Sequence, residues 1–295
     1  MLKGEALDDF MDRFWDSGDE KDGRHGRDGT GSPQSPVPEA EYEEYAFKED
    51  GLIIQPVHKG KVDRRTWTAL ALMLVTVPVM LYLSVAIFHG KKYMLFSLLV
   101  VFFAMVPFFL IFEGRHPQAR EIMVIAVLAA IGVAGRAAFF MVPSFKPIAA
   151  IVILAGVSFG GEAGFLVGTM IMMVSNMFFG QGPWTPWQMF SYGLIGFLTG
   201  ILFQKGILKA KRLHLCVYGF LSVFFIFGGI MNPASILMAY GRITWKSLIA
   251  FYISGAPVDL VQATSTVIFL WILSRPMLEK LERIKRKYGL IERIK

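Results

Sequence analysis

The sequence is poor in cysteine and in charge. Cys216 is the single cysteine among 295 residues, which excludes an internal disulfide and a metal site built from several cysteines. Only 18% of the residues are charged, whereas 54% are hydrophobic. A chain this apolar, with a mean hydropathy of +0.50, is neither an ordinary soluble domain nor a disordered one.

Enzyme motifs are also missing. The sequence contains no Walker A motif, no G-x-S-x-G motif and no Rossmann fingerprint, so we expect no ATP site within this chain. None of the five histidines is paired at the spacing of metal ligands: His25, His58, His89, His116 and His214. We therefore predict a protein without catalytic residues, metal or cofactor.

Charge is distributed unevenly along the chain. Residues 1–65 carry 16 acids and 10 bases, whereas residues 66–295 carry 7 acids and 20 bases. The bases of the second part lie in short loops between long apolar runs, which is typical of membrane topology rather than nucleic-acid binding. The acidic head, residues 1–65, lacks the apolar core of a signal peptide and is predicted to be a largely disordered cytoplasmic tail.

The body of the chain contains eight apolar segments. Most are 17 to 28 residues long, and about 20 residues suffice for a helix to cross the hydrocarbon core, so the sequence predicts an all-α membrane protein. The fourth segment has only 12 residues and predicts a partial or interrupted helix. The segments are 67–88, 93–112, 121–142, 147–158, 163–179, 187–204, 213–231 and 246–273.

The distribution of lysine and arginine predicts the orientation. If all eight segments cross, the more basic groups at 59–65, 115–120, 205–212 and 275–295 share one side of the membrane. We therefore expect a multi-pass protein of the plasma membrane with both termini in the cytoplasm. Residues 276–295 form a basic tail whose apolar residues recur at helical spacing, which predicts an amphipathic helix on the membrane surface or on a partner.

Two kinds of residue within the apolar segments suggest more than packing. Small residues allow helices to approach closely, and one row of them could serve internal packing or dock another subunit: Ala126, Ala130, Ala134 and Ala138. Polar residues at membrane depth are costly and often functional: Arg136, Glu162, Asn176, Asp259 and Gln262. An ion pair between Arg136 and Asp259 and a ligand-binding role for at least one of them are both open.

Residues 178–189, FFGQGPWTPWQM, combine two glycines, two prolines, two tryptophans and two glutamines in a predicted extracellular turn. Tryptophan is common at the membrane interface, so an aromatic belt explains part of this composition. A rigid Gly/Pro frame around indoles and amides nevertheless favours a preformed, aromatic-lined binding site.

On these residues, the region of about 120–274 resembles the substrate-binding S component of energy-coupling factor (ECF) transporters. The resemblance rests on the alanine row, on FKPIAAIVILAG (145–156), on the loop at 178–189 and on GAPVDLVQA (255–263). It implies a six-helix S-component-like bundle at 115–275. That bundle follows the head, 1–65, and two additional transmembrane helices in 66–114, and it precedes the tail, 276–295.

The resemblance also implies a function. An S component binds a vitamin from outside and associates with a transmembrane T subunit and two ATPases, with its alanine row as the docking face. The loop looks most like the branch associated with cobalamin and related corrinoids, while riboflavin, a queuosine-type precursor and other vitamins remain alternatives. Gln262 stands where some relatives have histidine. The expected substrate-binding residues are Arg136, Phe140, Asn176, Gln181, Trp184, Trp187, Gln188, Tyr192, Asn232, Asp259 and Gln262.

Two functions of other classes remain open. The interrupted fourth segment would also suit a stand-alone secondary transporter, although no inverted repeat is apparent. An intramembrane enzyme would have to use Glu162, Asp259 or Arg136, but the sequence offers no nucleophile with an adjacent base.

Overall fold

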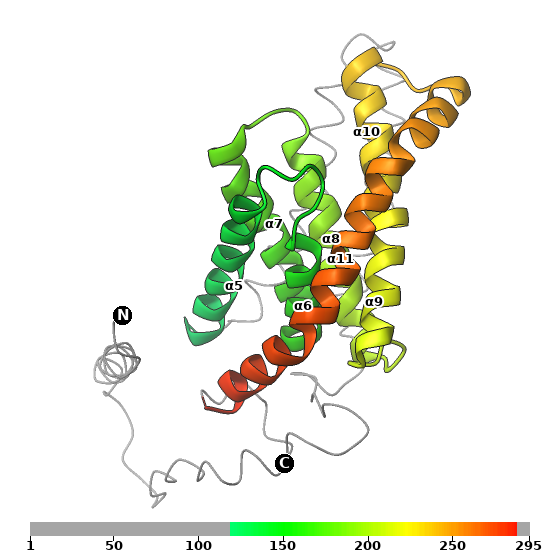
Figure 1. Cartoon of the computed structure of the whole chain (residues 1–295). Helices are drawn as coiled ribbons and strands as arrows, with labels where there is room; N and C mark the ends of the chain where they lie inside the picture. Colours follow the sequence, from blue (N-terminus) through cyan, green and yellow to red (C-terminus); the bar gives the residue numbers. More distant parts are fainter. Residues whose placement is uncertain (1–118, 288–295) are drawn as a thin grey trace, which may run out of the picture. The chain divides into compact units, whose positions relative to one another are not determined.

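The computed structural model describes residues 119–287, and within them every regular element is a helix (Figure 1). The three elements that end in α10 follow one another directly as a single helical stretch of 29 residues, Arg212–Tyr240. The elements are α5 (Ala119–Ala138), α6 (Ile148–Phe159), α7 (Gly161–Phe179), α8 (Thr185–Gln204), α9 (Arg212–Leu221), the π-helix η1 (Ser222–Phe227), α10 (Gly228–Tyr240) and α11 (Trp245–Lys287).

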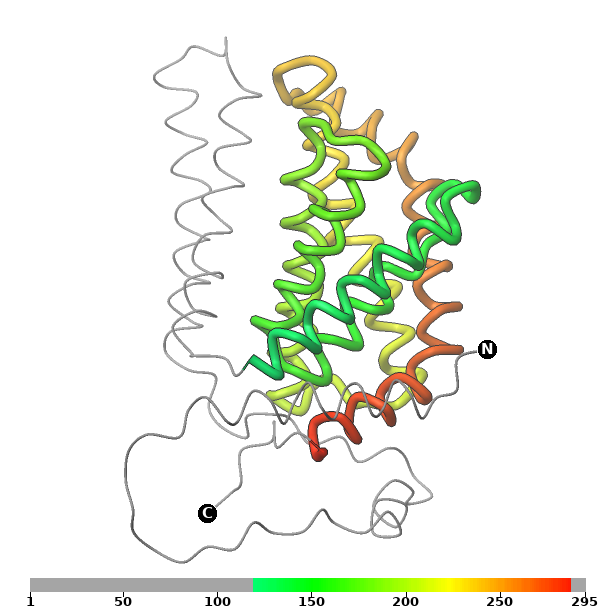
Figure 2. The backbone as a smooth tube through the Cα atoms, turned by 90° about the vertical axis from the view of Figure 1, so that its left-hand side faces the viewer, coloured from blue at the N-terminus to red at the C-terminus, as the bar shows by residue number. Residues whose placement is uncertain are grey.

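This order confirms the all-α class, and the six helical stretches follow the six segments expected for 115–275. The acidic head, the two additional spans and residues 288–295 lie outside the described residues. The eighth apolar segment and the start of the tail form one helix, because α11 continues through Pro276 to Lys287. In Figure 2 the end of α11 turns away from the axis of its preceding part, as a proline without a donor N–H permits.

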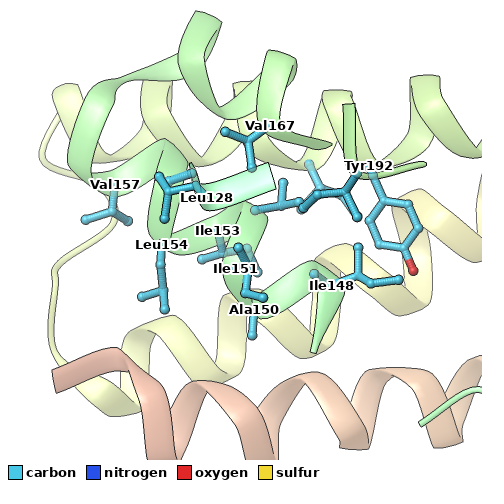
Figure 3. Packing of buried hydrophobic residues seen from close by; sticks show 14 of the residues in the cluster. Leu128, Ile148, Ala150, Ile151, Ile153, Leu154, Val157, Val167 and Tyr192 are labelled. Atoms are coloured by element: carbon cyan, nitrogen blue, oxygen red, sulfur yellow. The ribbon is translucent and has the colours of Figure 1, made fainter. Parts of the chain in front are cut away.

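The short helix α6 lies at the centre of the bundle. All 12 of its residues are buried, which explains why the segment is apolar on every side (Figure 3). At about 1.5 Å per residue it spans roughly 18 Å, well short of the hydrocarbon core. The helix starts after Pro147 and ends at Gly160, whose φ of 91° lies in a region that glycine tolerates.

Glycine rows bring α7 and α8 into close contact. A Cβ atom added to Gly164 would lie 2.6 Å from the carbonyl oxygen of Gly196, and one added to Gly168 would lie 2.6 Å from that of Tyr192. These glycines therefore serve the packing of this helix pair. The close approach fixes Tyr192 and the neighbouring residues of α8 against α7.

Four described helical stretches are long and apolar enough to cross a membrane: Ala119–Ala138, Gly161–Phe179, Arg212–Tyr240 and Trp245–Lys287. Helix α8 has 20 residues and therefore the length of a span, but it is less apolar because it carries polar residues such as Ser191 and Thr199. Both of these are buried, and each hydroxyl donates to a carbonyl one turn earlier, at 2.7 and 2.6 Å. Their polarity is thus satisfied inside the bundle.

Candidate ligand-binding site

Arg136 occupies the last turn of α5, at the end of the bundle where α5 and α7 stop and α6 and α8 begin. Its Nη1 atom donates to Ser175 Oγ at 2.6 Å and to Asn176 Oδ1 at 2.7 Å, both on α7. The guanidinium also lies 5.4 Å from the ring centre of Phe179. These neutral partners orient the arginine without neutralising its charge.

Asn176 is fully buried and joins three helices through its side chain. Its amide oxygen accepts from Arg136, while its Nδ2 donates to Gln188 Oε1 at 2.9 Å and to Thr185 Oγ1 at 3.1 Å. Thr185 Oγ1 also accepts from the backbone N–H of Gly182 at 3.3 Å. A buried amide with all these partners holds the ends of α5, α7 and α8 together.

A second polar contact joins α8 to α11. Gln262 Nε2 donates to the hydroxyl of Tyr192 at 2.7 Å, and the Tyr192 ring packs on Phe227 of η1 with centroids 4.9 Å apart. Tyr192 lies at one end of the central apolar cluster, beside Ile148 (Figure 3). An aromatic ring with a positioned hydroxyl suits the wall of a ligand site.

Several of these groups line a cavity of about 160 Å³, and its other lining residues also come from the elements between α5 and α11. Four of the lining residues were expected from the sequence: Arg136, Gln188, Tyr192 and Gln262. Five were not: Ser144, Lys146, Ile148, Met172 and Phe227. The cavity is smaller than most ligand pockets, which hold about 300–1,000 Å³, so a vitamin-sized ligand requires it to open.

The segment between α5 and α6, residues 139–147, covers one side of the cavity through Ser144 and Lys146. Ser265 Oγ of α11 donates to the backbone carbonyl of Lys146 at 3.2 Å and so ties the segment to the last helix. Burial lowers the pKa of Lys146, and the positive charge of Arg136 lowers it further. The one sequence signal for Lys146 is its place beside Pro147 in the 145–156 stretch that carries the family resemblance.

The two tryptophans do not line this cavity. Trp184 is 40% exposed and lies against Gly182, while Trp187 packs beside a cluster of Phe165, Phe190 and Phe197. The expected turn at 178–189 is also shorter than predicted, because α8 starts at Thr185 with a proline in its first turn. Among the residues of this motif, the cavity takes in only Gln188.

Phe140 and Gln181 also lie away from the cavity lining. Phe140 is 54% exposed and stacks on Phe179 with ring centroids 4.9 Å apart. Gln181 is exposed, and its Nε2 donates to the Met173 carbonyl at 3.5 Å. Phe140 thus contacts Phe179, the ring over which Arg136 lies, whereas Gln181 contacts α7 through Met173.

Asn232 and Asp259 form a separate polar pair between α10 and α11. Asn232 Nδ2 donates to Asp259 Oδ2 and to the Gly228 carbonyl, each at 2.9 Å. Arg136 and Asp259 therefore do not form the ion pair that the sequence left open, since each has other partners.

Helix α10 contains Pro233, which has no N–H to donate to the Gly229 carbonyl. The Tyr252 hydroxyl of α11 donates to that carbonyl at 3.0 Å instead.

The alanine row of α5 faces outward. Ala126, Ala130, Ala134 and Ala138 are all exposed, whereas Ile125, Leu128, Ala129 and Gly132 of the same helix are buried. The row therefore does not pack inside the described bundle. Its neighbours Ile122, Val127 and Ile131 are about half exposed, so the whole face is apolar.

A bound metal ion requires several ligand side chains close together. Within residues 119–287, no three His, Cys, Asp or Glu side chains come together as metal ligands do. The chemistry that the cavity offers is hydrogen bonding, aromatic contact and positive charge.

Comparison with known proteins identifies the family. Residues 117–279 match the model of the ECF-type riboflavin transporter S component, and this match covers more than half of the chain. The chain therefore belongs to the ECF-type S-component family, which is a family of transporter components rather than enzymes. It is a multi-pass membrane protein with several apolar helices.

Curated relatives are known as UPF0397 proteins. One from Vibrio atlanticus is 35% identical over 112 residues, covering 34% of this chain and 61% of that protein. Another from Aliivibrio salmonicida is 33% identical over 106 residues, covering 34% and 56%, respectively. The chain thus spans about half the length of the curated relatives it matches. No solved structure is similar enough to count as a match.

Proposed function

We propose that this chain is the substrate-binding membrane subunit of an ECF-type importer and captures a vitamin-like solute in the cavity around Arg136 and Tyr192. The observation that carries the proposal is the convergence of polar side chains from α5, α8 and α11 on one cavity within a bundle of this family. Polar groups at membrane depth are costly unless they serve a ligand or a structural contact. In this cavity the polar side chains make structural hydrogen bonds and also line the space that a ligand would occupy.

The proposed substrate is cobalamin or a related corrinoid, on the resemblance of the 178–189 motif. The family model is named for riboflavin, which makes riboflavin the first alternative. A corrinoid requires the larger opening, and the covering segment 139–147 is the part whose movement would enlarge the cavity. That segment contains Ser144 at φ 57°, a conformation uncommon for residues other than glycine.

The direct test is titration calorimetry of the full chain purified in detergent, with cobalamin, cobinamide and riboflavin as parallel ligands. Saturable 1:1 binding of a corrinoid but not riboflavin supports both the function and the substrate. Binding of riboflavin alone keeps the function and replaces the substrate. If none of the three binds, the proposed function fails for the vitamins it names.

We further propose that the exposed alanine row docks the T subunit of an ECF module, whose two ATPases supply the energy for release into the cytoplasm. Small residues on an outward face let a partner helix approach closely. Ala130→Trp places a large side chain on that face and is expected to abolish co-purification with the T subunit while leaving ligand affinity unchanged. Ala129→Gly, on the buried side of the same helix, is the control for a general effect on α5. Full co-purification of Ala130→Trp would move the docking face elsewhere.

A further inference from the structure

Two cations are among the residues that line the cavity. Arg136 projects from the end of α5, and Lys146 comes from the segment before α6. The side-chain partners of Arg136 are the hydroxyl of Ser175 and the amide oxygen of Asn176, and Lys146 Nζ donates to the Val142 carbonyl at 3.4 Å. All of these acceptors are neutral, so within residues 119–287 neither charge has an acidic partner at the cavity.

Carboxylates do not offset this charge. Among the described residues that line the cavity, none is aspartate or glutamate. Asp259 is the acid closest in sequence to the lining residue Gln262, and its carboxylate is bound to Asn232 instead. Glu162 stands in the first turn of α7, whereas Asn176 is in the last, so the two are separated by roughly 20 Å of helix at about 1.5 Å per residue.

Positive charges that share a partly buried cavity repel each other, and water screens them less there than on an open surface. Arg136 and Lys146 line the same cavity, and burial together with the positive charge of Arg136 lowers the pKa of the lysine. A bound anionic group would relieve this repulsion and would accept charge-assisted hydrogen bonds from both side chains.

The cavity lining also contains two amides, Gln188 and Gln262. They can bind neutral donors and acceptors of a ligand, while Tyr192 and Phe227 offer aromatic contact. The lining thus combines cations, amides and aromatic rings. This combination suits a ligand with a ring system and a negatively charged substituent.

Resting on the proposed function, we infer that the cavity selects the phosphorylated or carboxylated form of its solute, with Arg136 and Lys146 holding the anionic group. The inference makes the charge of the ligand, in addition to its ring system, a determinant of specificity. An anionic lipid headgroup has the same chemistry and is distinguished by the experiment.

The test compares two ligand pairs that differ in phosphate, riboflavin with FMN and cobinamide with cobalamin, by titration calorimetry of the full chain. FMN and riboflavin are the stricter pair, because cobalamin also carries a nucleotide base that cobinamide lacks. We expect the phosphate-bearing member of the pair that binds to be about ten- to hundredfold tighter, the range for hydrogen bonds to charged groups. Lys146→Gln is expected to remove most of that preference, because the affinity for the phosphate-bearing ligand should fall much further than the affinity for the phosphate-free one.

Lys246→Gln is the matched control. It removes the same charge from the start of α11, where Lys246 is exposed and outside the cavity lining, and should keep the preference. Equal affinity within the pair, or a preference that survives Lys146→Gln, overturns the inference and leaves the proposed function standing. Binding of none of the four ligands overturns both. If phosphatidylglycerol in the micelles abolishes the preference, the cations hold a lipid headgroup and the inference about the solute is overturned.

Discussion

Two polar clusters lie inside this bundle, and they differ in what surrounds them. The first cluster, Arg136, Asn176 and Gln188, borders a cavity, and its positive charge has no acidic partner in the part of the chain that the structure describes. The second, Asn232 and Asp259, is closed by two helices, and a Cβ added to Gly228 would lie 2.7 Å from the Asp259 carboxylate. One polar cluster of the bundle thus borders open space, whereas the packing of the helices encloses the other.

The largest expected effect comes from Asn176→Leu. It removes one hydrogen-bond partner each from Arg136, Gln188 and Thr185. Arg136 keeps Ser175 and Thr185 keeps Gly182, so we expect a total cost of about 1–3 kcal/mol. We expect the melting temperature in detergent and the ligand affinity to fall together. Thr169→Val is the control on the same helix, because Thr169 makes only one long bond, 3.5 Å to the Met189 carbonyl. An Asn176→Leu protein that melts normally would contradict the bridging role.

Asn232→Leu is expected to separate stability from binding. It leaves the Asp259 carboxylate without its donor and should destabilise the protein by about 1–3 kcal/mol, while the folded fraction keeps its ligand affinity. Adding Asp259→Leu should recover most of the loss, because replacing both partners of a buried pair is often nearly neutral. Thermal melting and calorimetry distinguish these outcomes. A loss of affinity in the double variant would bring the second cluster into the binding site.

Gln262→Leu is expected to show the opposite behaviour. The side chain lines the cavity and makes one hydrogen bond, to the Tyr192 hydroxyl, so the affinity should fall by about 1 kcal/mol, roughly fivefold, with little change in melting temperature. If the pair acts as a unit, Tyr192→Phe should lower affinity by a similar amount and the double variant by little more. Unchanged affinity in both single variants would remove α11 from the site.

Trp184→Ala should have the smallest effect. The side chain is 40% exposed and outside the cavity lining, so affinity is expected to stay within about twofold, as for most surface substitutions. Trp187→Ala serves as the comparison, because it removes packing against the phenylalanine cluster and should lower stability without changing affinity. A clear loss of affinity in Trp184→Ala would show that the loop closes onto the ligand, as the sequence alone had suggested.

The helices were largely predictable from the chain. Apolar length predicted α5 to α8 within a few residues, and it predicted that α6 is too short to span. The helix of 213–231 is longer than expected because Pro233 does not end it: the freed carbonyl of Gly229 finds a donor in Tyr252 of the next helix. No local pattern could show this compensation, since its two partners are 23 residues apart.

The site was only partly predictable. Arg136, Gln188, Tyr192 and Gln262 stood out as polar groups in apolar segments or near the unusual loop. Lys146 and Phe227 were not among the expected site residues. Their place at the cavity depends on the segments that fold beside them. The indoles were prominent in composition, yet the helix start at Thr185 turns them away from the cavity lining.

The sequence by itself determined that this is a membrane protein of the all-α class. The length of the apolar segments, the scarcity of charged residues and the rows of small residues depend on the chain alone. The tertiary structure decided which polar residues bond only to one another within the bundle and which line the cavity. The outcome depends on how helices that are distant in the sequence pack together. Arg136 comes within hydrogen-bonding distance of Asn176 across 40 residues, and Gln262 within that of Tyr192 across 70.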